Sequence, residues 1–133
     1  MLECLILGDS IAVGTAQNRP ECAVIAKVGI NSWQFNNKNI TKNLSAKTVV
    51  ISLGANDNIS VNTRRELETL RELVKADMVF WILPYNNPKI HAFIRELAED
   101  YRDVVLPIPT NTMGPDGVHP TAKGYKLLAN QTR

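Results

Sequence analysis

Short apolar runs that stop at small polar residues recur along the chain, and helical patterns lie between them. Buried β-strands are expected at residues 5–7, 22–26, 48–53, 78–83 and 104–106. Strands that alternate with helices pair in parallel, because right-handed crossovers lay the helices on both faces of one sheet. The pattern therefore predicts an α/β protein: a three-layer α/β/α sandwich with a five-stranded parallel sheet in the flavodoxin-like order 2-1-3-4-5.

Helix-start signals accompany most of the predicted helices. Thr63 is followed three residues later by Glu66, which predicts a capping box at the start of the third helix. Asn87 as cap and Pro88 at the first helical position predict the start of the fourth. The remaining helices are expected from residue 10, over about residues 32–42 and from about residue 121.

The length and charge of the chain fit one ordinary folded domain. Of its 133 residues 44% are hydrophobic and 21% are charged, which is unlike a disordered chain or a membrane protein. The net charge is only +2 and no basic block occurs, so nucleic-acid binding is not expected. We expect a single domain over residues 1–133 that is a monomer.

The two cysteines, Cys4 and Cys22, lie in apolar, strand-like runs and lack the spacing of metal ligands. We expect both to be reduced core residues, without a structural disulfide and without a metal site. No basic or apolar leader precedes the first strand, and no apolar stretch has the length of a membrane span. As written, the chain is expected to be cytoplasmic; a chain whose leader had been removed, or a protein released by lysis, would look the same.

Polar residues suited to acyl transfer fall at the predicted carboxyl edge of the sheet, where open α/β sheets bind ligands. Ser10 follows the first strand, and Asp116 and His119 lie in the loop after the fifth. A serine hydroxyl becomes nucleophilic when a histidine held by a carboxylate removes its proton. The backbone amides of Ser10 and Gly29 and the Asn56 side chain could then hold the oxyanion that forms on an ester carbonyl.

Each of these residues has an ordinary interpretation when taken alone. Gly, Asp and Ser are common turn formers, and an isolated histidine before a helix is usually a surface residue. Their joint placement at one sheet edge favours catalysis. Asp9 and Asp57 are expected to brace turns, Trp81 to lie in the core and His91 to be solvated. Solvated helix faces are expected for Lys38, Lys42, Arg64 and Arg65. The residues that could line the substrate cleft are Asn31, Ser32, Trp33, Tyr85 and Asn86.

These motifs resemble, in order and over nearly the whole chain, the four blocks of the SGNH (GDSL) hydrolase superfamily. The matching segments are Gly8-Asp9-Ser10, Gly29, Gly54-Ala55-Asn56-Asp57 and Asp116-Gly117-Val118-His119-Pro120. The resemblance implies Ser10 as nucleophile, His119 as base, Asp116 as its orienting carboxylate, and Gly29 and Asn56 as oxyanion donors. No cofactor is expected. Ile30-Asn31-Ser32-Trp33 replaces the small Ser-Gly stretch of many relatives, which leaves the donor in this loop open.

The resulting functional prediction is a serine carboxylic-ester hydrolase that removes a short acyl group, acetyl above all, from a polar or saccharide carrier. The loops between Asn56 and Thr63 and between Pro84 and Asn87 are too short to form a lid. Alternatives are a thioesterase or lysophospholipase, an enzyme of cell-wall glycan, acyl transfer to an acceptor other than water, and a catalytically silent carbohydrate-binding relative. A flavin-mononucleotide module would leave Asp116 and His119 without a role. A phosphoacceptor receiver would need a lysine after the fifth strand, and residues 107–111 contain none.

Overall fold

The computed structural model describes all 133 residues, and its centre is one five-stranded sheet. All neighbouring strands pair in parallel and the order is β2-β1-β3-β4-β5, which confirms the predicted topology. The strands are β1 (Leu2–Gly8), β2 (Ala23–Ala26), β3 (Ala46–Ser52), β4 (Met78–Ile82) and β5 (Val104–Leu106).

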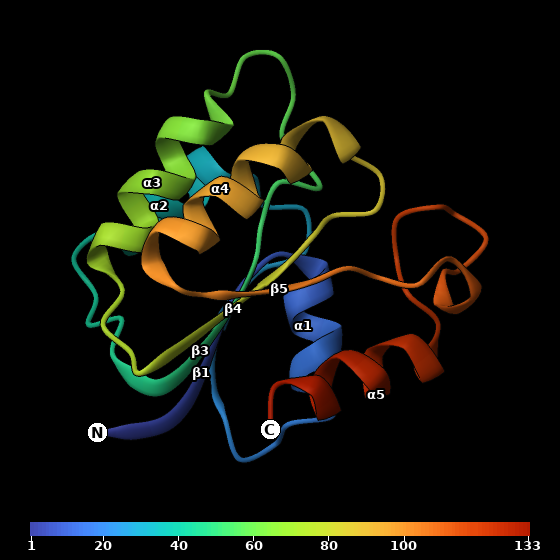
Figure 1. Ribbon diagram of the computed structural model, residues 1–133, viewed down its shortest axis with the longest axis horizontal. Helices are drawn as coiled ribbons and strands as arrows, with labels where there is room; N and C mark the ends of the chain where they lie inside the picture. The colour runs from blue at the N-terminus through green and yellow to red at the C-terminus, as the bar shows by residue number, and fades with distance from the viewer.

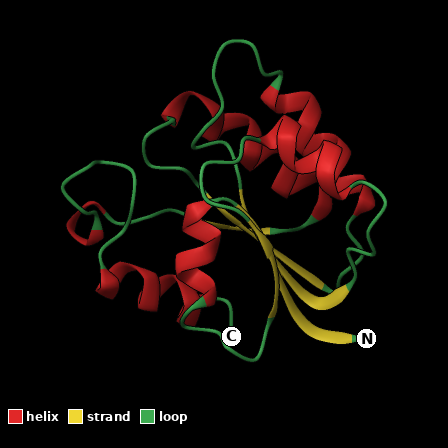
Figure 2. Cartoon of the chain, turned by 180° about the vertical axis from the view of Figure 1, so that it is seen from behind, coloured by secondary structure: helices red, strands yellow, loops and turns green.

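Helices cover both faces of the sheet and complete three layers (Figures 1 and 2). The helices are α1 (Ser10–Ala16), α2 (Ser32–Asn39), α3 (Thr63–Leu73), α4 (His91–Tyr101) and α5 (Ala122–Gln131), with short 3₁₀ turns η1 (Pro88–Ile90) and η2 (Thr110–Thr112). Helices α2, α3 and α4 pack side by side on one face, and α1 packs against α5 on the other. No helix is both long and apolar enough to cross a membrane.

Alternation of side chains along the strands produces two cores. In β1, Leu5 and Leu7 point toward α2, α3 and α4, whereas Cys4 and Ile6 point toward α1 and α5. All four are buried, as expected for a parallel strand covered on both faces. Trp81 of β4 is 1% exposed, which confirms its predicted core position.

Two predicted helix starts differ from the structure. Helix α3 is capped by Asn62, whose side chain accepts a hydrogen bond from the Arg65 amide at 3.2 Å. Thr63 is the first residue within the helix, and its hydroxyl donates to Asp57 at 2.8 Å. Asn87 makes no side-chain cap, and its side-chain amide donates to the Gly54 carbonyl at 2.9 Å. The 3₁₀ turn η1 precedes α4.

The boundaries of helices α2 and α5 lie closer to the predicted ones. Helix α2 ends at Asn39, three residues before the predicted end, and the Asn39 amide folds back to donate to the Phe35 carbonyl at 2.9 Å. Helix α5 has Thr121 as its cap, with the hydroxyl accepting from the Gly124 amide at 3.2 Å, as predicted.

The prediction that both cysteines are reduced is wrong, because Cys4 and Cys22 form a disulfide. Leu5 pairs with Ala23 across β1 and β2, so the preceding residues, Cys4 and Cys22, also face each other. Their Cα atoms lie 4.8 Å apart, within the range that a disulfide spans. The spacing of cysteines along a chain does not reveal this register, and the prediction failed for that reason.

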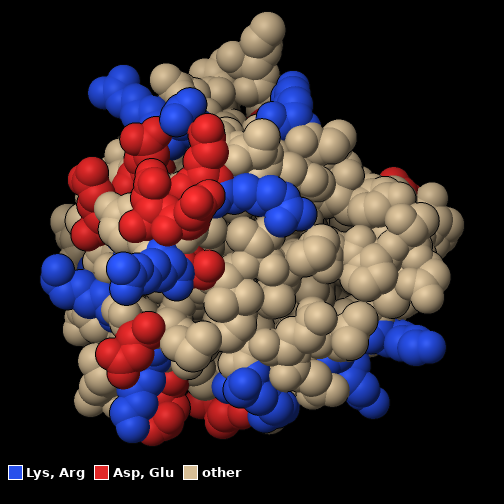
Figure 3. Space-filling model, in the orientation of Figure 1, with Lys and Arg blue, Asp and Glu red and all other residues tan.

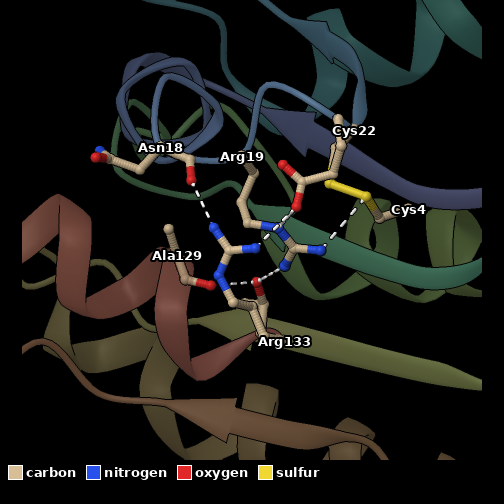
Figure 4. The surroundings of a disulfide bond; sticks show 8 residues. Cys4, Asn18, Arg19, Cys22, Ala129 and Arg133 are labelled. Carbon is tan, nitrogen blue, oxygen red and sulfur yellow. Dashed lines mark hydrogen bonds and ion pairs between the residues drawn. A yellow bond between two sulfur atoms is a disulfide. The ribbon is translucent and has the colours of Figure 1, made fainter.

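Charged side chains tie the C-terminus of the chain to the disulfide region (Figure 4). Arg19 is only 7% exposed; its guanidinium contacts Cys4 Sγ and donates to the Thr132 hydroxyl at the end of α5. Arg133 pairs with Glu21 at 2.9 Å and also donates to the Asn18 carbonyl. The α1–β2 loop is therefore held both by the disulfide and by the last residues of the chain.

Breaking the disulfide is expected to lower the free energy of unfolding by about 3 kcal/mol, because the bond closes a short loop in the unfolded chain. Urea unfolding followed with and without a thiol reductant measures this difference. The Cys4→Ala/Cys22→Ala double variant is the control, and the reductant should not change its free energy of unfolding. Two titratable thiols in unreduced, unfolded wild-type protein would contradict the bond.

Candidate active site

Ser10 meets His119 and Asp116, from the other end of the sequence, at the carboxyl edge of the sheet in one chain of hydrogen bonds. Ser10 Oγ lies 2.7 Å from His119 Nε2, and His119 Nδ1 lies 2.6 Å from Asp116 Oδ2. A proton on Nδ1, shared with the carboxylate, leaves Nε2 free to accept the serine proton. The geometry is that of a Ser-His-Asp triad, which can activate a serine hydroxyl for attack on a carbonyl group.

The sequence around Asp116 holds its carboxylate in place. One oxygen accepts hydrogen bonds from the backbone amides of Val118 and His119, both at 2.9 Å, while the other contacts the imidazole. The bond from the His119 ring, and secondarily those two amides, hold the pKa of Asp116 well below its usual range. This carboxylate is therefore ionised wherever the protein is folded near neutral pH, and it can stabilise a neighbouring imidazolium.

A tight turn between β1 and α1 presents Ser10. Gly8 has φ +140°, and a Cβ atom there would lie 1.8 Å from the Ser52 carbonyl oxygen, so only glycine fits. Asp9 caps α1: its Oδ1 accepts from the Ile11 amide at 3.0 Å and from the Ser52 hydroxyl at 3.2 Å. These bonds fit the bracing role expected of Asp9.

Asp9 is fully buried, and its second carboxyl oxygen, Oδ2, has no hydrogen-bond partner. Burial raises the pKa of Asp9 to about 6, against the opposing effect of the bonds from Ile11 and Ser52. The group therefore braces the turn through one oxygen only.

Three hydrogen-bond donors in the segments that follow β1, β2 and β3 are unused or partly used. The backbone amides of Ser10 and Gly29 donate to no other backbone or side-chain group. The Asn56 side chain donates one of its two amide protons to the Ile30 carbonyl at 3.0 Å and keeps the other. Gly29 has φ +83° and open space where a Cβ would lie, so the backbone is accessible there. These donors could receive an oxyanion.

Asp57 joins the two loops that carry these donors. Its carboxylate accepts from the Ser32 amide at 2.9 Å, from the Ser32 hydroxyl, and from Thr63 at 2.8 Å. The bracing is therefore between the β2–α2 and β3–α3 loops, rather than within the turn after β3. Sequence reasoning missed this link; the only signal was that Asp57 directly follows Asn56 at the shared sheet edge.

The predicted substrate-lining residues have different environments. Ser32 is fully buried with both of its donors on Asp57, and Asn31 caps α2 through its bond with the Gln34 amide. Trp33, in the first turn of α2, is 54% exposed. Tyr85 donates to Thr110 Oγ1 at 3.3 Å, next to the loop that carries Asp116. Asn86 donates to the Ala55 carbonyl, beside Asn56.

His91 is not simply solvated, as expected, because its Nε2 lies 2.7 Å from the Pro84 carbonyl oxygen and the side chain is partly buried. Arg64 pairs on the surface with Glu68 and Glu96, consistent with the solvated helix face predicted for it. Neither residue contacts the triad.

Comparison with solved structures finds this fold in proteins that include the following three from bacteria. A protein assigned as an acylhydrolase from Bacteroides fragilis superposes with a TM-score of 0.71 at 18% identity, covering 97% of this chain and 83% of the other. One assigned as an SGNH hydrolase from Slackia heliotrinireducens gives 0.70 at 16% identity, covering 98% of both chains. The catalytic domain of Streptococcus pneumoniae peptidoglycan O-acetyltransferase A, bearing a methylsulfonyl adduct, gives 0.63 at 21% identity, covering 96% and 88%.

No family model and no curated protein matches the sequence. The structural likeness therefore establishes the fold: the chain has the three-layer fold of SGNH hydrolases, as the resemblance of its motifs implied.

Proposed function

We propose that the chain is a serine carboxylic-ester hydrolase that acts on short acyl esters of a polar or saccharide carrier. The observation that carries the proposal is the hydrogen-bonded series Ser10–His119–Asp116, with distances of 2.7 and 2.6 Å. A catalytically silent carbohydrate-binding relative would have no need of this series. The fold shared with acylhydrolase-like proteins supports the same conclusion.

In the proposed reaction, Ser10 Oγ attacks the ester carbonyl and its proton passes to His119 Nε2. The carbonyl oxygen becomes an oxyanion held by the Ser10 and Gly29 amides and by Asn56. The intermediate collapses to acyl-Ser10, and His119 gives the proton to the departing alkoxide. Water then attacks the acyl carbonyl and loses a proton to His119. As the bond between the acyl carbon and Oγ breaks, His119 returns the proton to Ser10 Oγ and the carboxylic acid leaves.

The openness of the site favours a short acyl group. The side chains of His119 and Asp116 are 43% and 51% exposed, so the triad lies near the surface. An open site cannot shield a long acyl chain from water, and each methylene left exposed forgoes about 0.8 kcal/mol of binding. An acetyl group, which has no methylene, forgoes the least binding free energy in this way. The exposed Trp33 and Asn86 side chains suit a hydroxylated carrier.

Acyl transfer to a saccharide hydroxyl is the second candidate. It follows from the same acyl-serine if a sugar hydroxyl, in place of water, gives its proton to His119. The likeness to the catalytic domain of a peptidoglycan O-acetyltransferase favours this candidate over thioester or lipid hydrolysis.

The disulfide supports action in an oxidising compartment. Such bonds persist outside the reducing cytosol and are rare within it. We infer from Cys4–Cys22 that the chain works in such a compartment, where a carrier such as a cell-surface glycan would be within reach.

Hydrolysis of p-nitrophenyl acetate, octanoate and palmitate under identical conditions tests the proposed acyl preference. We expect kcat/KM to be highest for acetate and to fall with chain length. A value that rises to octanoate or beyond would favour a thioesterase or lipase instead. Adding a sugar acceptor and measuring acetylated sugar against free acetate separates transfer from hydrolysis.

A further inference from the structure

A groove lined by three lysines adjoins the loop that carries Gly29. A cavity of about 350 Å³ is lined by Lys27, Gly29, Ile30, Gln34 and Lys38, together with Val28. A second cavity, of about 240 Å³, shares Lys27, Ile30 and Lys38 with the first and continues along α2 to Lys42. We refer to these two joined cavities as the lysine groove.

The charges of the lysine groove have no counter-ions in the protein. None of the ion pairs involves Lys27, Lys38 or Lys42. The charge on Lys27 lowers the pKa of Lys38, so the two ammonium groups are close enough to repel each other. Acidic side chains gather elsewhere, over α3 and α4 (Figure 3), and α2 contains none. An anion in the groove would relieve this repulsion.

Lys27 and Lys38 do not lie within an edge strand, where lysines would serve to prevent pairing with other chains. β2 is an edge strand of the sheet, and lysines within such a strand discourage pairing with other chains. Lys27, however, follows the last residue of β2, and Lys38 lies on α2. Both line the same cavity as Gly29.

The lysine groove shares Gly29 with the proposed oxyanion site. Gly29 lines the groove, and its amide is one of the free donors proposed to hold the oxyanion. The neighbouring Ile30 carbonyl accepts from Asn56, which ties the wall of the groove to the second donor at 3.0 Å. A carrier whose ester carbonyl lies at these donors can therefore extend directly into the groove.

From this placement we propose that the lysine groove binds the carboxylate groups of an anionic saccharide carrier while its acyl ester lies at Ser10. The assignment rests on the proposed ester hydrolysis for the location of the ester. Lysine ammonium groups supply the charge recognition, and the Gln34 side-chain amide beside them can meet sugar hydroxyls. The substrate class becomes an O-acylated, carboxylate-bearing oligosaccharide.

Binding of tetragalacturonate to the Ser10→Ala protein tests the groove without relying on turnover. At low ionic strength we expect it to shift the amide resonances of Lys27, Gly29 and Ile30 in an NMR titration. Neutral maltotetraose should leave them unshifted. The Lys27→Ala/Lys38→Ala variant should bind tetragalacturonate about tenfold more weakly, because two exposed charge contacts are lost.

Lys126→Ala is the matched control, because Lys126 is an exposed lysine of α5, on the opposite face of the sheet. It should bind tetragalacturonate as the parent does. Unweakened binding by the double variant, shifts confined to other surfaces, or equal binding of maltotetraose would overturn the proposal. Tighter binding of an oligophosphate of equal charge would overturn the carboxylate assignment. Failure of wild-type p-nitrophenyl acetate hydrolysis would instead contradict the proposed function.

Discussion

The Ser10→Ala variant is expected to hydrolyse p-nitrophenyl acetate about a millionfold more slowly than the wild type, the loss typical of removing a triad nucleophile. The serine hydroxyl contacts only His119, so the fold should survive its removal. Turnover is measured beside the circular dichroism spectrum of each protein. Ser60→Ala, an exposed serine in the β3–α3 loop, is the control and should keep the wild-type rate. A folded Ser10→Ala protein with near-wild-type turnover would refute the mechanism.

Asp116→Asn is expected to slow turnover by about ten-thousandfold, because the carboxylate both orients the imidazole and stabilises its charged form. The lowered pKa of Asp116 keeps this carboxylate ionised far into acid. Its contribution to stability is present at neutral pH and is lost only as the pH falls from the ordinary aspartate range toward that lowered value. Asp116 therefore stays ionised between about pH 5 and 8, so a rise in rate over this range does not report Asp116.

The measurement is the rate of p-nitrophenyl acetate hydrolysis across this pH range for both proteins. We expect the wild-type rate to rise with pH and the variant rate to be low throughout. Asp100→Asn, on the exposed surface of α4, is the control and should follow the wild-type profile. A wild-type rate that is flat from about pH 5 to 8 would contradict base catalysis by His119.

The sheet order could be predicted because each strand ends at a polar turn. A run such as Leu5–Leu7 gives a strand, the following Ser10 starts a helix, and the alternation permits few topologies. The hydrogen-bonded series Ser10–His119–Asp116 could be placed for the same reason. Parallel strands bring their carboxyl ends to one edge, so Ser10 and His119 meet there although 109 residues separate them.

The features that sequence reasoning missed depend on how neighbouring segments line up. The disulfide depends on the register of β1 against β2, which the apolar runs around Cys4 and Cys22 do not specify. The cap of α3 is Asn62, one residue before the predicted Thr63, whose hydroxyl instead donates to Asp57. Asp57 itself was expected to act within its own turn, and its bonds to Ser32 arise only once two loops are folded side by side.

The lysine groove was missed for a related reason. Lys38 looks like an ordinary solvated helix residue in sequence, and its closeness to Lys27 appears only when α2 packs beside the end of β2. Two cations without a partner are then visible next to Gly29. Surface residues follow no hydrophobic pattern in the sequence, so their roles can be inferred only once their neighbours in the folded chain are known.

The most direct test of the account is to find which residue a sulfonyl fluoride modifies. Phenylmethylsulfonyl fluoride forms a sulfonate ester with an activated serine oxygen and releases fluoride, and peptide mass spectrometry locates the adduct. We predict one adduct per chain, on Ser10, and none in the His119→Ala protein, whose serine lacks its base. An adduct on another residue, or an unmodified Ser10 in protein that hydrolyses p-nitrophenyl acetate, would contradict it.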